Sequence, residues 1–136
     1  MKAPTQAAHL TENDTVLRLV HRAPVTVFLD TTLRACARVM EEESIGAVLV
    51  VSGHDTVGIL SERDIVAAVA GGAGVDFHLA RDYMTADVDT VPETVTIGQA
   101  MTEMLRNEIR HLAVSRDDRT IGLISIRDLA GALAAG

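Results

Sequence analysis

Hydrophobic and polar residues follow two alternating patterns along this chain, one typical of strands and the other of helices. Residues 25–29 are rich in β-branched side chains and predict a short strand. Residues 45–51 form a nearly continuous aliphatic run, which predicts a strand covered on both faces. Between them, residues 31–43 predict a helix, because four apolar residues recur at the spacing of one buried face: Leu33, Cys36, Ala37 and Met40.

The elements that follow complete one structural copy, and the same order then returns. Turn residues at 52–55 lead into a strand at 56–60, so the two strands are predicted to form a hairpin. Ser61 opens a second helix that ends at the paired glycines 71–72. The second half repeats this order with a strand start at 90–91, a helix at 96–108, strands at 109–114 and 120–124, and a helix from 125 onward.

The two halves also agree at many positions, without a gap, when Gly58 is aligned with Gly122. A single copy is of marginal size for a stable fold of its own. We therefore predict an α/β (α+β) protein in which two β-α-β-β-α copies bury open sheet faces against each other about a pseudo-twofold axis. The identical pairs include Thr26/Thr90, Val27/Val91, Thr32/Thr96, Met40/Met104, Ile45/Ile109, Val50/Val114, Thr56/Thr120, Gly58/Gly122, Ser61/Ser125, Arg63/Arg127 and Asp64/Asp128.

The repeat sets the expected boundaries within the chain. Residues 1–13 are polar and mixed, and we expect a loose terminus. Residues 14–72 form the first repeat, in which 14–21 are predicted to be a short helix or turn that docks through its aliphatic side chains. Residues 73–87 have partial helical character and are expected to form a structured connector. The second repeat covers residues 88–136.

Composition and charge restrict the classes of function. Aliphatic residues must build the core, because hydrophobic residues make up 48% of the chain and aromatic residues only 2%. A net charge of −7 argues against binding a nucleic acid polymer or a membrane through a basic surface. No apolar run approaches the roughly 20 residues that span a bilayer, and the first residues lack the apolar stretch of a secretory signal. We therefore expect a cytoplasmic protein.

No catalytic or metal-binding cluster stands out in the sequence. Cys36 is the single cysteine, which excludes an intrachain disulfide, and its place on a helix core face favours a small buried residue over a nucleophile. The five histidines lack metal-ligand spacing. The sequence therefore predicts neither an enzyme nor a metal site.

One motif occurs twice, at residues 58–64 and 122–128: Gly, two aliphatic residues, Ser, any residue, Arg and Asp. Its glycine leaves room for the close approach of a backbone or a ligand. Its carboxylate could hold both hydroxyl groups of a ribose through two acceptor oxygens, with a further contact from the serine. Ser-x-x-Asp before an apolar helix is also a capping signal. Both interpretations stay open, and they can coexist, for Ser61/Asp64 and Ser125/Asp128.

With these motifs in this order, the chain resembles the CBS domain family, named after cystathionine β-synthase, and the tandem pair resembles a Bateman module. The resemblance covers roughly residues 14–136, and residues 109–114 and 83–85 are also similar to the family's middle strand and to the entry into its second copy. It implies a regulatory sensor of adenosine nucleotides that binds its ligand in two clefts between the copies. The implied ligands are AMP, ADP or ATP, with S-adenosylmethionine, NAD or a cyclic dinucleotide as alternatives.

The resemblance also implies what such a protein works with. It implies no required cofactor and no catalysis, and it implies a homodimer. Because no effector domain is attached in this sequence, we expect the output to pass through an unidentified effector protein. The alternative is a structural or interaction module that binds no ligand and acts through its dimer surface.

The resemblance implies that each cleft takes its ribose-binding aspartate from one repeat and its phosphate-binding residues from the other. The Asp64 cleft would then have two guanidinium groups and an imidazole on its phosphate side, from Arg127, Arg110 and His111. Arginine stays charged and can bind phosphate through two hydrogen bonds. We therefore expect the Asp64 cleft to bind phosphorylated nucleotides more tightly than the other cleft.

The other implied site residues have weaker chemistry of their own. They are Arg63, Gly46 and Ala47 on the phosphate side of the Asp128 cleft, and Thr26, Val27, Thr90 and Val91 beside the adenine. Each basic residue also has a simpler interpretation. The first-turn arginines can face solvent or pair with a neighbouring carboxylate, and the basic residues of the middle strand can be exposed at a sheet edge.

Overall fold

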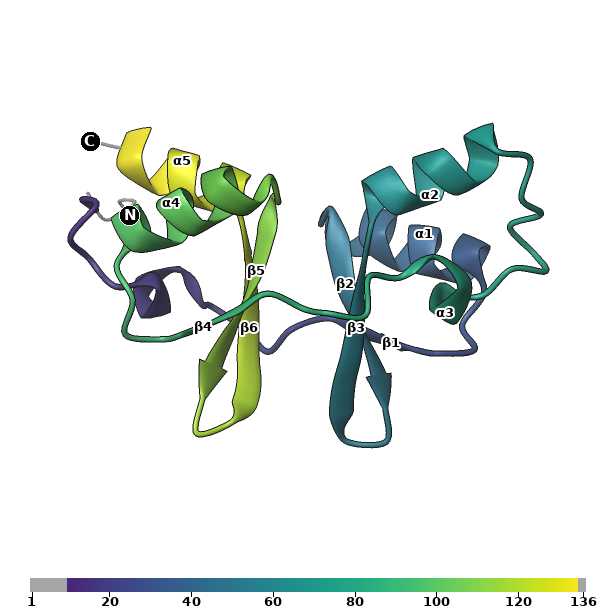
Figure 1. The fold of residues 1–136 in the computed structure, drawn as a ribbon, viewed down its shortest axis with the longest axis horizontal. Coiled ribbons are helices and arrows are strands. Elements are labelled where there is room, and N and C mark those ends of the chain that lie inside the picture. Colours follow the sequence, from purple (N-terminus) through teal and green to yellow (C-terminus); the bar gives the residue numbers. More distant parts are fainter. Residues whose placement is uncertain (1–9, 135–136) are drawn as a thin grey trace, which may run out of the picture. The chain divides into compact units, whose positions relative to one another are not determined.

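The computed structural model describes residues 10–134, and their contacts divide the chain into two compact units (Figure 1). One unit is the continuous stretch Pro24–Val88, which we call the first-repeat unit. The other, the second-repeat unit, combines the described residues before Pro24 with those from Asp89 onward. The segment that precedes Pro24 therefore packs with the second repeat, although it is adjacent in sequence to the first.

Each unit contains a three-stranded sheet with helices. The first-repeat unit contains β1 (Thr26–Phe28), α1 (Leu33–Glu43), β2 (Ala47–Ser52), β3 (Asp55–Ser61), α2 (Glu62–Ala70) and α3 (Ala80–Tyr83). The second-repeat unit contains the 3-10 helix η1 (Val16–Leu19), β4 (Thr90–Pro92), α4 (Ile97–Asn107), β5 (His111–Arg116), β6 (Arg119–Ser125) and α5 (Ile126–Ala134). The predicted strand–helix–strand–strand–helix order is confirmed in both copies, and the predicted packing of the copies against each other stays a prediction.

In each sheet, the second strand along the chain lies in the middle. β1 runs parallel to β2, and β3 runs antiparallel to β2; β4, β5 and β6 are arranged in the same way. The parallel pairs are joined through α1 and α4, because parallel neighbours need a crossover connection. In the antiparallel pairs the register shifts after Val50 and Val114, which pair with Gly58 and Gly122. The predicted hairpins are confirmed, and each carries an irregularity at the same place.

Aliphatic side chains build a separate core in each unit. On α1, Leu33, Cys36 and Met40 are buried and Ala37 is half-buried, which confirms the predicted face. Burial raises the pKa of the Cys36 thiol to about 11, so the thiol stays protonated and unreactive near neutral pH. Along β2 the consecutive residues from Ala47 to Val50 are buried, as expected for a strand covered on both faces.

The helices α1 and α4 both end at a residue with left-handed backbone conformation. These residues are Ser44, with φ 56°, and Glu108, with φ 54°. The amide that follows Glu108 donates to Met104 O over 3.0 Å, which closes the helix end before β5 begins. This conformation favours glycine over other residues. At Glu108 the negative charge also lies at the negative end of the helix dipole.

We expect Glu108→Gly to stabilise the protein by about 0.5–1 kcal/mol, because it relieves both the backbone strain and the charge at the helix end. Urea unfolding would measure the change. Glu108→Ala is the matched control, since it removes the charge but keeps the Cβ atom, and its gain should be smaller. If the two variants were equally stable, the backbone explanation would be wrong.

The glycines of the repeated motif make room for segments of their own units. A Cβ atom at Gly122 would lie 2.8 Å from Cγ1 of Val20, and a Cβ atom at Gly58 would lie 2.5 Å from Sδ of Met84. Thr85 O would lie 3.1 Å from that second Cβ atom. The sequence did not show whether a backbone or a ligand approaches these glycines closely. In the structure, a segment of the same unit approaches each of them.

Candidate functional site

The Ser-x-x-Asp motif caps the N-terminus of α2 in the first repeat. Ser61 N donates to Asp64 Oδ2 over 2.8 Å, and Asp64 N donates to Ser61 Oγ over 3.3 Å. The Ser61 hydroxyl group also donates to Asp64 Oδ2, over 3.0 Å. The capping interpretation of the motif is confirmed, because serine and aspartate satisfy each other's backbone amides.

The second repeat has the same cap at the start of α5. Ser125 N donates to Asp128 Oδ2 over 2.8 Å, and Asp128 N donates to Ser125 Oγ over 3.0 Å. In both repeats the cap uses Oδ2, and Oδ1 of Asp64 and of Asp128 accepts no hydrogen bond from residues 10–134. One carboxylate oxygen in each repeat can therefore accept a hydroxyl group of a ligand without breaking the cap.

The start of the middle strand lies beside the cap in the first repeat. Gly46 O accepts from Glu62 N over 2.9 Å, so the residue before β2 is bonded to the first residue of α2. Ala47 pairs with Ser61 across the hairpin. The structure thus brings Gly46, Ala47, Ser61 and Asp64 together at one end of the first-repeat sheet.

The second repeat makes the same contacts with different side chains. Arg110 O accepts from Ile126 N over 2.8 Å, and His111 pairs with Ser125. Where the first repeat has two small residues, the second has a guanidinium group and an imidazole beside its cap. The ends of the two sheets therefore differ in charge although their backbones match.

The first strands carry their candidate residues further from the caps. Thr26 pairs with Leu49, which lies about 7 Å along β2 from Ala47, the first residue of that strand. Thr26 is exposed, whereas Val27 is 4% exposed and belongs to the core of its unit. Val27 can therefore meet a ligand only through its backbone. In the second repeat Thr90 is exposed, and Val91 packs partly against the core.

The arginines beside the caps are exposed. Arg63, Arg110 and Arg127 make no ion pair with another residue in the range 10–134. The alternative of a salt bridge to a neighbouring carboxylate therefore fails within this range, and the three charges are available to an anion. His111 is half-buried and has an interaction partner within the protein.

The described residues offer little support for other kinds of site. Within residues 10–134, no group of three or more His, Cys, Asp or Glu side chains could hold a metal ion. Over the same range, each helix is too short or too polar to cross a bilayer. The caps and the arginines beside them are thus the strongest candidate site in this range.

We expect Ser61→Ala to lower the stability of the protein by about 1 kcal/mol, because the Asp64 amide loses its acceptor at the start of α2. Thermal or urea unfolding would measure the loss. Ser61→Thr is the matched control, since threonine keeps the hydroxyl group and should cost less. An alanine variant as stable as the native chain would show that the cap contributes nothing to the fold.

The chain is similar to known sequences along most of its length. The family model described as the CBS domain matches residues 10–71 and again residues 80–135. Among curated proteins, an uncharacterized 17.7 kDa protein of Acidianus ambivalens is 38% identical over 106 residues, which are 76% of this chain and 63% of that protein. This chain therefore matches less than two thirds of the length of that relative.

Solved structures share the fold. A putative signal-transduction protein with CBS domains from Burkholderia ambifaria has 32% sequence identity and a TM-score of 0.85, with 89% of this chain and 94% of that chain covered. A CBS domain protein from Pyrobaculum aerophilum, whose structure is complexed with AMP, has 27% identity and a TM-score of 0.77. That comparison covers 90% of this chain and 99% of the other.

Proposed function

Because this chain belongs to the CBS domain family and contains two such domains in tandem, we propose that it is a regulatory module that binds an adenosine nucleotide. The similar protein from Pyrobaculum aerophilum, which is complexed with AMP, supports AMP as the first ligand to test. ADP, ATP, S-adenosylmethionine, NAD and cyclic dinucleotides follow it.

The observation that carries this proposal is the arrangement at the caps. Each cap holds its aspartate in place by backbone and serine contacts and leaves Oδ1 as an acceptor, so Asp64 and Asp128 are suited to a ribose hydroxyl group. Oδ1 has two acceptor positions, so it could accept both hydroxyl groups of a ribose without taking Oδ2 from the cap.

The exposed charges support the proposed phosphate contacts. Arg127, Arg110 and His111 lie beside the Asp128 cap, but the family resemblance implies that each ligand takes its phosphate contacts from the repeat opposite its aspartate. These three residues would then serve the phosphate of the ligand that Asp64 holds, and Arg63 alone would supply a charge for the ligand that Asp128 holds. Guanidinium groups without an internal ion pair lose no partner when they bind an anion. We therefore propose that the Asp64 ligand carries more phosphate charge than the Asp128 ligand.

The module is proposed to act without catalysis, by changing its conformation or its dimerisation when the nucleotide binds. A homodimer, an effector protein and a cytoplasmic location are parts of the same proposal. The match covers 63% of the Acidianus relative, so that protein has further residues outside the match. The effector protein would have to be identified by experiment.

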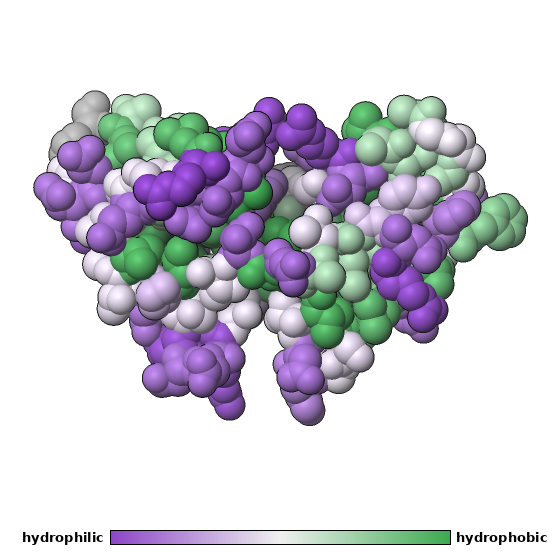
Figure 2. Space-filling view, viewed as in Figure 1, coloured by the Kyte–Doolittle hydropathy of each residue, from purple (hydrophilic) through white to green (hydrophobic). Residues whose placement is uncertain are grey.

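One observation favours the second candidate function, an interaction module. Large hydrophobic side chains reach the surface of the first-repeat unit, and green areas in Figure 2 mark surface of this kind. Val66 and Val69 on α2 are 66% and 56% exposed, and Phe77 in the segment after α2 is 85% exposed. Val66 and Val69 lie one helical turn apart on α2, and exposed apolar neighbours of this kind are typical of a protein contact surface.

Isothermal titration calorimetry with AMP, ADP, ATP, NAD, S-adenosylmethionine and cyclic di-AMP would separate the two functions. The sensor proposal predicts saturable binding of at least one ligand, with a loss of affinity in Asp64→Ala or Asp128→Ala. Absence of binding by every ligand, at protein concentrations up to the millimolar range, would favour the interaction module instead.

A further inference from the structure

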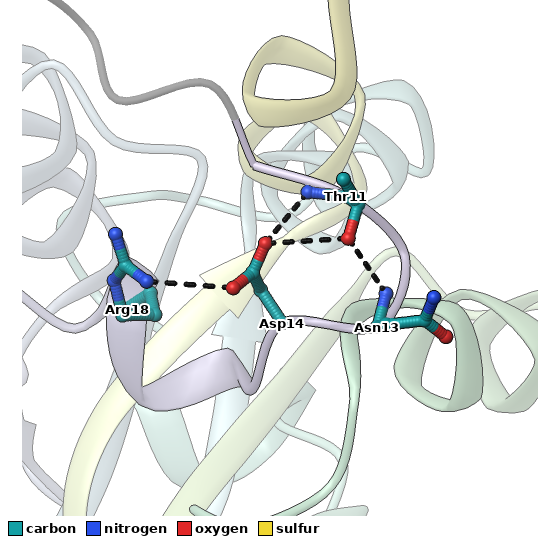
Figure 3. A network of polar contacts seen from close by, with 4 residues as sticks. All are labelled: Thr11, Asn13, Asp14 and Arg18. Carbon is teal, nitrogen blue, oxygen red and sulfur yellow. Dashed lines mark hydrogen bonds and ion pairs between the residues drawn. The ribbon is translucent and has the colours of Figure 1, made fainter.

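One chain segment in the second-repeat unit holds the N-terminus of α4. Glu12 O accepts from Gly98 N over 2.9 Å, and Asp14 O accepts from Ile97 N over 2.8 Å. We call this segment, residues 10–20, the N-terminal strap. Its own side chains fix its shape, as Figure 3 shows: Asp14 accepts from Thr11 N over 2.8 Å and from Arg18 Nη1 over 3.4 Å, and Asn13 N donates to Thr11 Oγ1 over 3.2 Å.

An equivalent segment, residues 74–84, holds the N-terminus of α1 in the first-repeat unit, and we call it the connector strap. His78 O accepts from Leu33 N and Val75 O accepts from Arg34 N, each over 3.0 Å. Asp76 also forms an ion pair with Arg34, so this strap is bound to α1 by side chains as well.

Each strap ends against the glycine of the repeated motif in its own unit. Val20 is the residue that a Cβ atom at Gly122 would meet, and Met84 is the residue that a Cβ atom at Gly58 would meet. At Gly122 an extra methyl group would clash with the β-branched side chain of Val20, and at Gly58 it would meet the flexible side chain of Met84 and, over 3.1 Å, Thr85 O. The last residue of each strap therefore packs closely against its glycine.

Beyond this contact, each strap continues into the first strand of the other unit (Figure 1). After Val20 the chain reaches Val25, whose carbonyl accepts from Leu49 N over 3.1 Å, and then forms β1. After Met84 it reaches Asp89, whose carbonyl accepts from Ala113 N over 3.0 Å, and then forms β4. The strands β1 and β4 carry the proposed adenine contacts.

We propose that the two straps couple the repeats, so that displacing the strap from its glycine in one unit loosens the first strand of the other unit. The covalent link is short, since the stretch from Val20 to Val25 spans at most about 18 Å even when fully extended. Pro24 stiffens this link because its ring fixes φ. Each of β1 and β4 has only three residues at a sheet edge, so few hydrogen bonds resist the displacement.

The coupling would let a nucleotide at the first strand of one repeat change the contacts that a strap makes with the start of α1 or α4 in the other repeat. That use in regulation rests on the proposed function, whereas the coupling itself needs no ligand. The two ideas can therefore fail separately, provided that the coupling is tested in the absence of nucleotide.

Amide hydrogen exchange followed by NMR, without ligand, tests the coupling. Gly122→Ala is expected to displace Val20 and to raise the exchange rate of the Leu49 amide about fivefold or more. Val20→Ala, which loosens the same contact without a clash, should act in the same direction if Gly122→Ala folds poorly. The double variant Val20→Ala/Gly122→Ala should bring the Leu49 rate back toward the native value.

Two controls decide whether the strap carries the effect. Gly58→Ala tests the reciprocal coupling, from the connector strap to β4, and should raise the exchange rate of the Ala113 amide. Ile124→Val removes a methyl group from the core of the second-repeat unit without displacing the strap, and it should leave Leu49 unchanged. The proposal is overturned if Leu49 keeps its rate while Ile97 and Gly98 exchange faster in Gly122→Ala, or if Ile124→Val raises the Leu49 rate as much.

Discussion

Replacing Asp64 with alanine is expected to weaken AMP binding by about tenfold or more. A hydrogen bond to a charged group contributes about 1.5–3 kcal/mol, and 1.4 kcal/mol corresponds to a tenfold change in affinity. The variant removes the Oδ1 acceptor that the cap leaves unused and the negative charge that favours a hydroxyl donor. Calorimetric titration of AMP into the native protein and into Asp64→Ala would measure the change in Kd.

The matched control separates the carboxylate from the helix cap. Ser61→Ala weakens the cap but keeps the Asp64 carboxylate, so its effect on AMP affinity should be clearly smaller than that of Asp64→Ala. Equal losses in both variants would mean that the helix cap, and not the carboxylate contact, supports binding. A larger loss in Asp128→Ala than in Asp64→Ala would show that the ranking of the two sites is wrong.

Gly122→Ala is expected to destabilise the protein by about 1–3 kcal/mol, the range for inserting an extra carbon into a packed site. The new methyl group would lie 2.8 Å and 3.0 Å from the two γ carbons of Val20, and a β-branched side chain has few other rotamers to adopt. Gly58→Ala should cost less, because the atom it meets belongs to the flexible side chain of Met84. Urea unfolding of both variants would measure the difference.

A compensating substitution tests the cause of that destabilisation. Val20→Ala removes the two γ carbons, so the double variant Val20→Ala/Gly122→Ala should recover part of the stability lost in Gly122→Ala. Additive losses in the double variant would contradict a steric clash. A Gly58→Ala variant less stable than Gly122→Ala would show that the Thr85 carbonyl, and not Met84, limits the space at Gly58.

Local pattern was sufficient to predict the elements of this fold. The apolar spacing in 31–43 identified the face of α1 that the structure buries, and Ser-x-x-Asp matched a capping signal, which the structure contains at the start of α2 and of α5. These predictions succeed because periodicity and capping depend on residues within one or two turns of each other.

The packing partner of a segment was harder to predict. The aliphatic residues of 14–21 correctly indicated a docked segment, and Val16 is fully buried. They did not indicate that the partner is the second repeat, because hydrophobic periodicity shows which face is buried and not which surface covers it. The same limit applies to Gly58 and Gly122, whose spacing marks a close approach without identifying Met84 and Val20.

The candidate site was visible in part. The residue types at both caps and the extra positive charge beside the second cap are evident from the aligned repeats. That each cap uses one carboxylate oxygen and leaves the other could come only from atomic positions. The burial of Val27 likewise needed the structure, since Thr26 and Val27 look equally suited to a ligand in the sequence.

The central claim is that an adenosine nucleotide binds at the Ser-x-Arg-Asp caps, and an NMR titration of isotope-labelled protein with AMP tests it most directly. We expect saturable shifts that are largest at the backbone amides of Ser61 and Asp64, together with shifts at Arg110, His111 and Arg127. Absence of saturable shifts, or shifts confined to residues away from both caps, would contradict the claim.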